Sequence, residues 1–147
     1  MLSQPTSTMT MKIKRRYSEL KLYDTFIDRY KYLKLTGEVG STTFGFDRYL
    51  NQTLYHSPRW RKARRDVIIR DNGCDLGIEG YDLYDKVIIH HMNPISMEDL
   101  ENDDPAIFDP EFLICVSHKT HNAIHYGDES QLPRDYKERK PGDTMLW

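Results

Sequence analysis

Four histidines carry the most chemical information in this sequence. His90 and His91 end an apolar run that begins at Val87, and His121 and His125 stand four apart further along the chain. An α-helix brings residues i and i+4 onto one face, so His121 and His125 can present two ring nitrogens to a single ion. Catalytic metal sites commonly use three protein ligands and leave a position open for water or substrate. The spacing therefore predicts a catalytic metal site.

The third ligand has to come from the apolar run, which is expected to be a strand. Side chains alternate between the two faces of a strand, so His90 and His91 point to opposite sides. One of them can bind the ion while its neighbour faces substrate as a base. Because imidazoles accept several metals, the identity of the divalent ion stays open among Mg, Mn, Ni and Zn.

The composition is that of a single soluble domain. The chain has 147 residues, of which 38% are hydrophobic and 30% charged, and its mean hydropathy is -0.73. No apolar run approaches the roughly 18 residues that a membrane span needs, so no membrane partner is expected. The polar segment Met1–Thr10 lacks the apolar core of a signal peptide, which makes a cytoplasmic location the default expectation.

Charge is unevenly distributed, although the net charge is only -2. The segment Ser57–Arg70 carries six basic residues and one acid, whereas Met97–Glu111 carries seven acids and no base. The basic segment is expected to contact DNA phosphates, which positions DNA without reading its sequence. The candidate contacts are Arg59, Arg61, Lys62, Arg64, Arg65 and Arg70. The alternative is a solvated helix whose charges pair with the acidic segment.

Two helices are expected before the basic segment. Apolar residues at helical spacing predict the first over Tyr23–Leu33, with Asp24 or Thr25 as its cap. The second is expected over about Phe46–Tyr55. An extended arm up to about Thr10 precedes both.

The basic segment itself is expected to be the third helix. Ser57 is a good N-cap, and Pro58 is a good first helical residue. Trp60, Ala63 and Val67 then share one face of the helix. We assign this face, like the apolar stripe of the first helix, to the core rather than to a base-stacking surface.

The region around the first histidine pair is expected to be a β-hairpin. Asp71–Gly73 is a turn sequence, and the second limb of the hairpin is predicted over Tyr84–His91, stopped by Pro94. The acidic segment is expected to form a helical turn plus a loop. A short strand over Phe112–Val116, a helix over Lys119–His125 ended by Gly127, and an extended tail from Pro133 complete the chain.

The two cysteines, Cys74 and Cys115, allow a second interpretation that involves a metal. Together with His118 they could hold a zinc ion, although a fourth ligand is missing. Buried free thiols are the favoured interpretation, because cytoplasmic cysteines need not pair.

The order of these features resembles that of the HNH nucleases. In those proteins a ββα-metal motif holds one divalent ion between a hairpin and a helix, and the His-His pair followed by His-x3-His is similar to the arrangement in nuclease colicins. The stretch Trp60–Gly77 is similar to the helix, turn and first cysteine that precede the motif in many HNH proteins. The stretches Phe44–Leu50 and Pro141–Trp147 are similar to phage-encoded HNH proteins.

The resemblance implies an α+β fold in which an N-terminal helical extension packs on a ββα-metal nuclease core, also called a His-Me finger. Residues 1–56 are then the arm and helices, residues 57–130 the core with its basic helix, and residues 131–147 the extended tail. The resemblance implies His90, His121 and His125 as metal ligands. It implies His91 as the base that activates water, and products with 5′-phosphate and 3′-hydroxyl ends.

One site residue departs from the family pattern. The family's middle asparagine pins the loop and orients the base, but the corresponding positions here hold Glu111 and Phe112. Asp109, Glu111 and Asn122 are the candidate replacements for this loop-orienting role. Half of the cysteine ligands of the zinc knuckle found in many relatives are also missing.

The sequence thus predicts a metal-dependent DNA endonuclease that nicks DNA or cleaves both strands, and that acts in the host cytoplasm if it is phage-encoded. The alternative is a non-catalytic, metal-stabilised DNA-binding or phage packaging accessory protein, with packaging proteins as further partners. A metal-dependent RNase would use the same chemistry. Homing, genome processing during packaging and attack on host DNA are the open roles.

Overall fold

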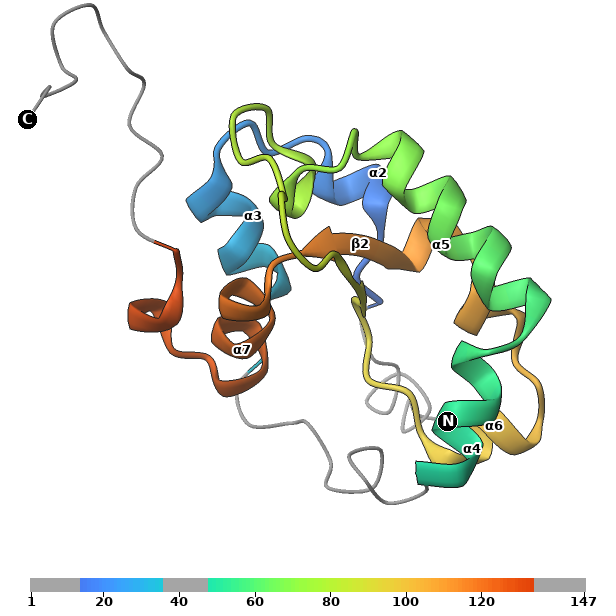
Figure 1. The fold of residues 1–147 in the computed structure, drawn as a ribbon. Helices are drawn as coiled ribbons and strands as arrows, with labels where there is room; N and C mark the ends of the chain where they lie inside the picture. Colours follow the sequence, from blue (N-terminus) through green and yellow to red (C-terminus); the bar gives the residue numbers. More distant parts are fainter. Residues whose placement is uncertain (1–13, 36–47, 134–147) are drawn as a thin grey trace, which may run out of the picture.

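The computed structural model of the protein describes residues 14–35 and 48–133 (Figure 1). The predicted arm up to Thr10, the start of the second helix at Phe46, and the tail beyond Pro133 lie outside these residues. So do the flanking stretch Pro141–Trp147 and most of Phe44–Leu50.

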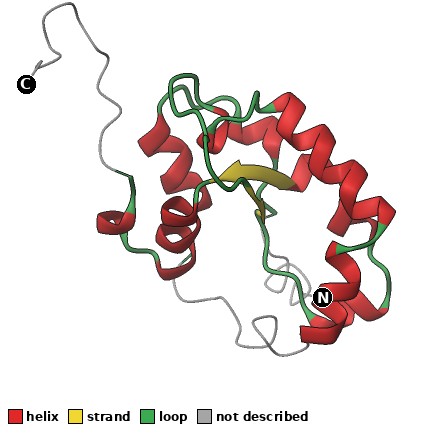
Figure 2. Cartoon of the chain, viewed as in Figure 1, coloured by secondary structure: helices red, strands yellow, loops and turns green. Residues whose placement is uncertain are grey.

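Helices and two short strands make up the described part of the chain, which is therefore α+β as predicted (Figure 2). The helices are α2 (Tyr17–Leu20), α3 (Phe26–Leu33), α4 (Arg48–Tyr55), α5 (Pro58–Arg70), α6 (Met97–Glu101) and α7 (His118–Tyr126). The strands are β1 (Ile88–His91) and β2 (Leu113–Val116). Short 3₁₀ turns are η1 (Asp75–Gly77), η2 (Pro105–Phe108), η3 (Pro110–Phe112) and η4 (Glu129–Gln131).

The two strands form an antiparallel sheet that lies between two layers of helix (Figure 1). His90 pairs with Ile114, and His91 pairs with Leu113. Directly paired residues project from the same face of a sheet, and neighbours along a strand from opposite faces. One face of the sheet packs on α3 and α7 through Ile114 and Val116, and the other packs on α5 through Leu113, Cys115 and Ile89.

The helix boundaries follow the capping residues in the sequence. Thr25, rather than Asp24, caps α3, because its side chain accepts a hydrogen bond from the Asp28 N–H. Ser57 caps α5 by accepting from the Trp60 N–H, as predicted. The predicted core face of α5, with Trp60, Ala63 and Val67, is buried. Gly127 ends α7 in the left-handed conformation, with φ of 65°.

The predicted hairpin is wrong. Strand β1 starts at Ile88 instead of Tyr84, and its partner is β2 rather than a preceding strand. The chain before β1 makes η1 and one isolated bridge between Cys74 and Asp82. The physical reason is that several residues in and after the turn have positive φ angles. The φ angle is 65° at Gly73, 55° at Leu76, 67° at Gly77 and 97° at Gly80. An extended strand cannot pass through these values.

The acidic segment forms a helical turn followed by loop and 3₁₀ turns, as predicted. Ser96 and Asp99 make a capping box at the start of α6. Pro105 and Pro110 lie in the first turns of η2 and η3. A backbone N–H at such a position has no partner within the helix, so its absence in proline breaks no hydrogen bond. No helix in residues 14–35 and 48–133 is long and apolar enough to cross a membrane.

Candidate metal centre

Three of the four histidines come together in the structure. One ring nitrogen from each of His90, His121 and His125 lies within 4.8 Å of the other two. The centroid distances from the His90 ring are 5.3 Å to His121 and 5.2 Å to His125, and His121 and His125 are 4.2 Å apart. These are the three residues expected to be ligands.

The fold explains why residues so far apart in sequence meet. His90 projects from the same face of the sheet as Ile114, and this face packs on α7. His121 and His125 lie one turn apart on α7, which starts directly after β2 with only Ser117 between them. Antiparallel pairing of β1 with β2 therefore brings His90 to the helix.

The three rings are neutral at neutral pH. His90 is only 2% exposed, and its burial, with the repulsion that His121 and His125 would exert when protonated, holds its pKa well below the usual value. Burial is also the main reason that the pKa of His121 is lowered to about 4. Burial lowers the pKa of His125 as well. Neutral imidazole is the form that offers a lone pair to a metal ion.

A metal ion fits this arrangement. Nε2 of His90 is buried and has no hydrogen-bond partner among the described residues, a situation that typically costs about 1–3 kcal/mol. Nε2 of His121 and Nε2 of His125 are 2.9 Å apart. Metal-to-imidazole bonds of roughly 2.0–2.1 Å place tetrahedral ligands somewhat over 3 Å apart, so the nitrogens of His121 and His125 would move slightly apart, and a pair near the 4.8 Å limit would move closer by roughly 1.5 Å. Three imidazoles would then leave one or more positions open.

His91 lies on the opposite face of the sheet, as the alternation predicted. Its ring stacks on Trp60 of α5, with centroids 5.1 Å apart and an interplanar angle of 24°. Its Nε2 is 3.1 Å from the Ile107 carbonyl oxygen in η2. A carbonyl can only accept, so Nε2 carries the proton and Nδ1 is left with the lone pair. Burial lowers the pKa of His91 to about 4, against the raising effect of this hydrogen bond.

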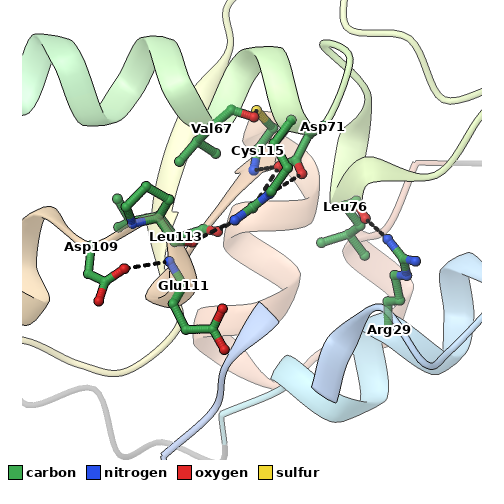
Figure 3. Close-up of polar contacts among 10 residues, drawn as sticks. Arg29, Val67, Asp71, Leu76, Asp109, Glu111, Leu113 and Cys115 are labelled. Atoms are coloured by element: carbon green, nitrogen blue, oxygen red, sulfur yellow. Dashed lines mark hydrogen bonds and ion pairs between the residues drawn. The ribbon is translucent and has the colours of Figure 1, made fainter. Parts of the chain in front are cut away.

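The candidate loop-orienting side chains make their hydrogen bonds elsewhere. Asp109 accepts from the Glu111 N–H at 2.9 Å (Figure 3), and Glu111 accepts from the Ser18 N–H. Asn122 lies 3.2 Å from Nε2 of His118, one turn back on α7. The group that orients His91 is instead a backbone carbonyl, which no residue type in the sequence could reveal. The nearest sequence signal was Pro105 at the start of the turn that presents it.

A basic segment that sequence reasoning did not connect with the site lies beside it. Asn93, two residues after β1, accepts from the Arg15 N–H at 2.8 Å and donates to the Arg15 carbonyl at 3.0 Å. The charge of Arg15 contributes to the lowered pKa of His90. Lys14 and Arg16 lie over the ring of Phe112, at 5.3 and 5.9 Å from its centroid. Phe112 is therefore a platform for cations.

Among the described residues, some cations of α5 form ion pairs and others line a groove. Arg59 binds Asp103 through two contacts of 2.9 Å, so pairing with the acidic segment holds at this position. Lys62 pairs with Asp66 one turn away at 2.7 Å. Three of the cations, with two isoleucines, line a shallow groove of about 280 Å³: Arg61, Arg64, Arg65, Ile68 and Ile69.

Arg70, also expected to contact DNA, is engaged inside the protein. Its guanidinium donates twice to Asp71 and once each to the Pro110 and Leu113 carbonyls, the last two at 2.6 Å. It also lies 3.7 Å from the centre of the Tyr17 ring. Asp71 in turn accepts from the Cys115 N–H. Arg70 ties the end of α5 to β2 and is left with little donor capacity for phosphate.

The two cysteines are buried and free, as favoured from the sequence. Burial and the nearby Asp82 carboxylate raise the pKa of Cys74 to about 11, and burial raises the pKa of Cys115. Both are therefore protonated thiols at neutral pH in the metal-free protein. Within the described residues the only grouping of side chains suited to a metal is the histidine cluster, so Cys74, Cys115 and His118 do not form a second site.

The chain was compared with protein-family models, with curated proteins and with solved structures. No family model, no curated protein and no solved structure matches the chain.

Proposed function

We propose that the protein is a metal-dependent endonuclease of the HNH type that hydrolyses phosphodiester bonds in DNA. In this proposal β1, β2 and α7 form the ββα-metal core, and His90, His121 and His125 hold one divalent ion. The observation that carries the proposal is the clustering of these three rings, with one nitrogen of each within 4.8 Å of the others. A purely structural histidine cluster would not require a fourth histidine at the same end of β1.

When bound, the ion would supply a Lewis acid that polarises the scissile phosphate and stabilises the leaving 3′-oxygen. The chain supplies the base. Nδ1 of His91 takes a proton from the attacking water, because the Ile107 carbonyl already holds the proton on Nε2. Stacking on Trp60 keeps the ring in one orientation. The lowered pKa of His91 keeps the ring neutral, with its Nδ1 lone pair free, throughout the neutral range, and it also makes the ring a weaker base than an ordinary histidine.

The donor set narrows the range of metals. All three candidate ligands are imidazoles, and the group contains no carboxylate. Mg²⁺ prefers oxygen ligands, whereas Zn²⁺ and Ni²⁺ are well suited to imidazole. We therefore rank Zn²⁺ and Ni²⁺ ahead of Mn²⁺, with Mg²⁺ last.

The position of α5 beside β1 supports a role for its groove in DNA binding. Trp60 near the start of α5 contacts His91 at the end of β1, and Arg64 further along donates to the carbonyl of Val87 just before β1. The helix therefore runs antiparallel to β1. The groove of α5 is then placed to hold phosphates flanking the cut, without reading bases.

The alternative of a non-catalytic DNA-binding or packaging accessory protein arose from the missing asparagine. The Ile107 carbonyl supplies the orientation of His91 that this asparagine was expected to provide. This contact is the specific observation that favours catalysis over the accessory role. A metal-dependent RNase remains an outcome of the test, because the same groups would attack an RNA phosphodiester.

The test is a plasmid-nicking assay with Zn²⁺, Ni²⁺, Mn²⁺ or Mg²⁺, run in parallel with a single-stranded RNA. Wild type is compared with His91→Ala, His125→Ala and the control His56→Ala, which removes an exposed histidine outside the cluster. We expect wild type and His56→Ala to cut DNA and the other two variants to lose at least about 100-fold in rate. DNA binding without cutting under every ion supports the accessory role. Cleavage of RNA alone supports the RNase.

A further inference from the structure

Asp75 is a buried carboxylate outside the histidine cluster that connects two parts of the fold. It lies in η1, is 2% exposed, and accepts a hydrogen bond from the Ser117 N–H at 3.2 Å through Oδ1. Its Oδ2 accepts from the Thr120 hydroxyl at 2.7 Å. Both donors belong to the beginning of α7. One side chain thus holds the start of the helix that carries His121 and His125.

These contacts constrain α7 in both translation and rotation. Thr120 is fully buried and directly precedes His121 in sequence. Ser117 is the N-cap, and its hydroxyl accepts from the Thr120 N–H and donates to the Thr120 hydroxyl. A helix that slid or rotated by one residue, a turn of about 100°, would break both hydrogen bonds to Asp75. The carboxylate also faces the positive end of the helix dipole.

The other side of this connection is fixed as well. Arg29 of α3 donates through Nη1 to the Leu76 carbonyl in η1 at 2.7 Å (Figure 3). The Asp75 N–H donates to the Tyr81 carbonyl at 2.8 Å. Gly77 has φ of +67°, and a Cβ there would lie 3.2 Å from Oδ1 of Asp71. η1 is therefore a tightly held base from which Asp75 reaches α7.

The metal centre needs such an anchor because its candidate ligands come from two separate elements. His90 belongs to β1, whereas the other two belong to a helix of nine residues. The ring nitrogens from these separate elements must reach metal-bonding distance together, so the position of α7 relative to β1 decides whether all three can bind one ion.

We infer that Asp75 is a positioning residue of the metal centre, which sets the register of α7 so that His121 and His125 meet His90 around one ion. This inference rests on the proposed function and adds a residue that touches neither the ion nor the substrate. Groups that orient metal ligands typically change metal affinity by about 10- to 100-fold when they are removed.

The experiment is a Co²⁺ titration, followed by visible absorption and by competition with a chelator, on wild type, Asp75→Ala and Asp75→Asn. Val67→Ala is the matched control, because Val67 is fully buried in the other core, on the α5 side of the sheet, and lies outside the metal centre. We expect a rise in Kd of roughly 10- to 100-fold for Asp75→Ala and a smaller rise for Asp75→Asn, which keeps one acceptor oxygen. Val67→Ala should lose thermal stability but keep its Kd within about twofold of wild type.

Hydrogen exchange of the metal-free proteins gives a second readout. Backbone amides of α7 should exchange faster in Asp75→Ala than in Val67→Ala, because the anchor of this helix is lost. Equal losses of Co²⁺ affinity in the two variants, or unchanged α7 exchange, would overturn the inference. Wild type that binds no Co²⁺ would overturn the metal centre itself. If Asp75→Ala does not fold, the comparison of Asp75→Asn with Val67→Ala decides.

Discussion

His90 and His91 are consecutive in β1, yet their rings lie in different layers of the protein. His90 faces His121 across the interface with α7, whereas His91 stacks on Trp60 of α5. His90, which is proposed to hold the ion, therefore packs against α7, whereas His91, which is proposed to move the proton, packs against α5. Variants of α5 and variants of α7 should consequently affect different steps.

Trp60→Leu should lower the rate of cleavage without weakening metal binding. The substitution removes the ring that supports His91 while leaving the histidine cluster on the other face intact. Loss of orientation is expected to reduce kcat by about 10- to 100-fold. Trp60→Phe, which keeps an aromatic surface, should retain most of the rate. Measurement of kcat beside Co²⁺ affinity checks this, and a parallel loss of both would contradict it.

The metal-free protein should lose stability as the pH falls from about 6.5 to about 4. The pKa of His91 and the pKa of His121 are both lowered to about 4, mainly by burial. Below pH 6.5 the unfolded chain binds protons at these rings that the folded protein does not, so the free energy of unfolding decreases with falling pH. Urea unfolding at a series of pH values in chelator measures the slope. His91→Gln should flatten it, whereas His56→Gln, at an exposed position, should not.

Substitution of Arg70 should lower the stability of the protein, whereas substitution of Arg65 should change DNA binding and leave the stability almost unchanged. Arg70→Ala leaves the buried Asp71 carboxylate without its partner and should destabilise the protein by roughly 3–5 kcal/mol. Arg70→Lys should not restore the stability, because one ammonium cannot make four such contacts.

Arg65→Ala, at an exposed position of the groove, should leave stability within about 0.5 kcal/mol of wild type. Its effect should appear in DNA binding, where the slope of log K against log salt falls by about one. Fluorescence anisotropy over a salt series measures this slope. An unchanged slope would exclude Arg65 from the DNA-binding surface.

Removal of metal should lower the melting temperature of wild type but not that of His125→Ala. An ion present at about 100 times its Kd stabilises the folded state by about 2.7 kcal/mol, provided that it does not bind the unfolded chain. Thermal unfolding with Zn²⁺ and with chelator gives the difference directly. A melting temperature of His125→Ala that still rises with Zn²⁺ would place the ion elsewhere.

The spacing of residues in the sequence was sufficient to predict the parts of the candidate site that depend only on the local geometry of a strand or a helix. The opposite orientation of His90 and His91 follows from strand alternation, and the proximity of His121 and His125 follows from helical periodicity. The contacts that depend on tertiary packing could not be predicted. The Ile107 carbonyl has no sequence signature, and the internal engagement of Arg70 depends on β2 lying beside the end of α5.

The pairing partner of β1 was also beyond local reasoning. Apolar residues before His90 indicate a strand, but they do not say which segment it pairs with. The positive φ angles around Leu76 and Gly77 exclude the nearest candidate, and only Gly77 carries that preference in its residue type. The ββα-metal arrangement itself stays a proposal.

The pairing of β1 with β2 has a consequence for how the chain reaches its folded state. The two strands are joined by the long acidic segment, and His90 and His121 stand on opposite sides of that loop. Closing a loop of about twenty residues or more costs conformational entropy that grows slowly with its length. An ion shared by these histidines would act as a reversible cross-link across the loop, so metal supply would govern how completely the protein folds as well as whether it cuts.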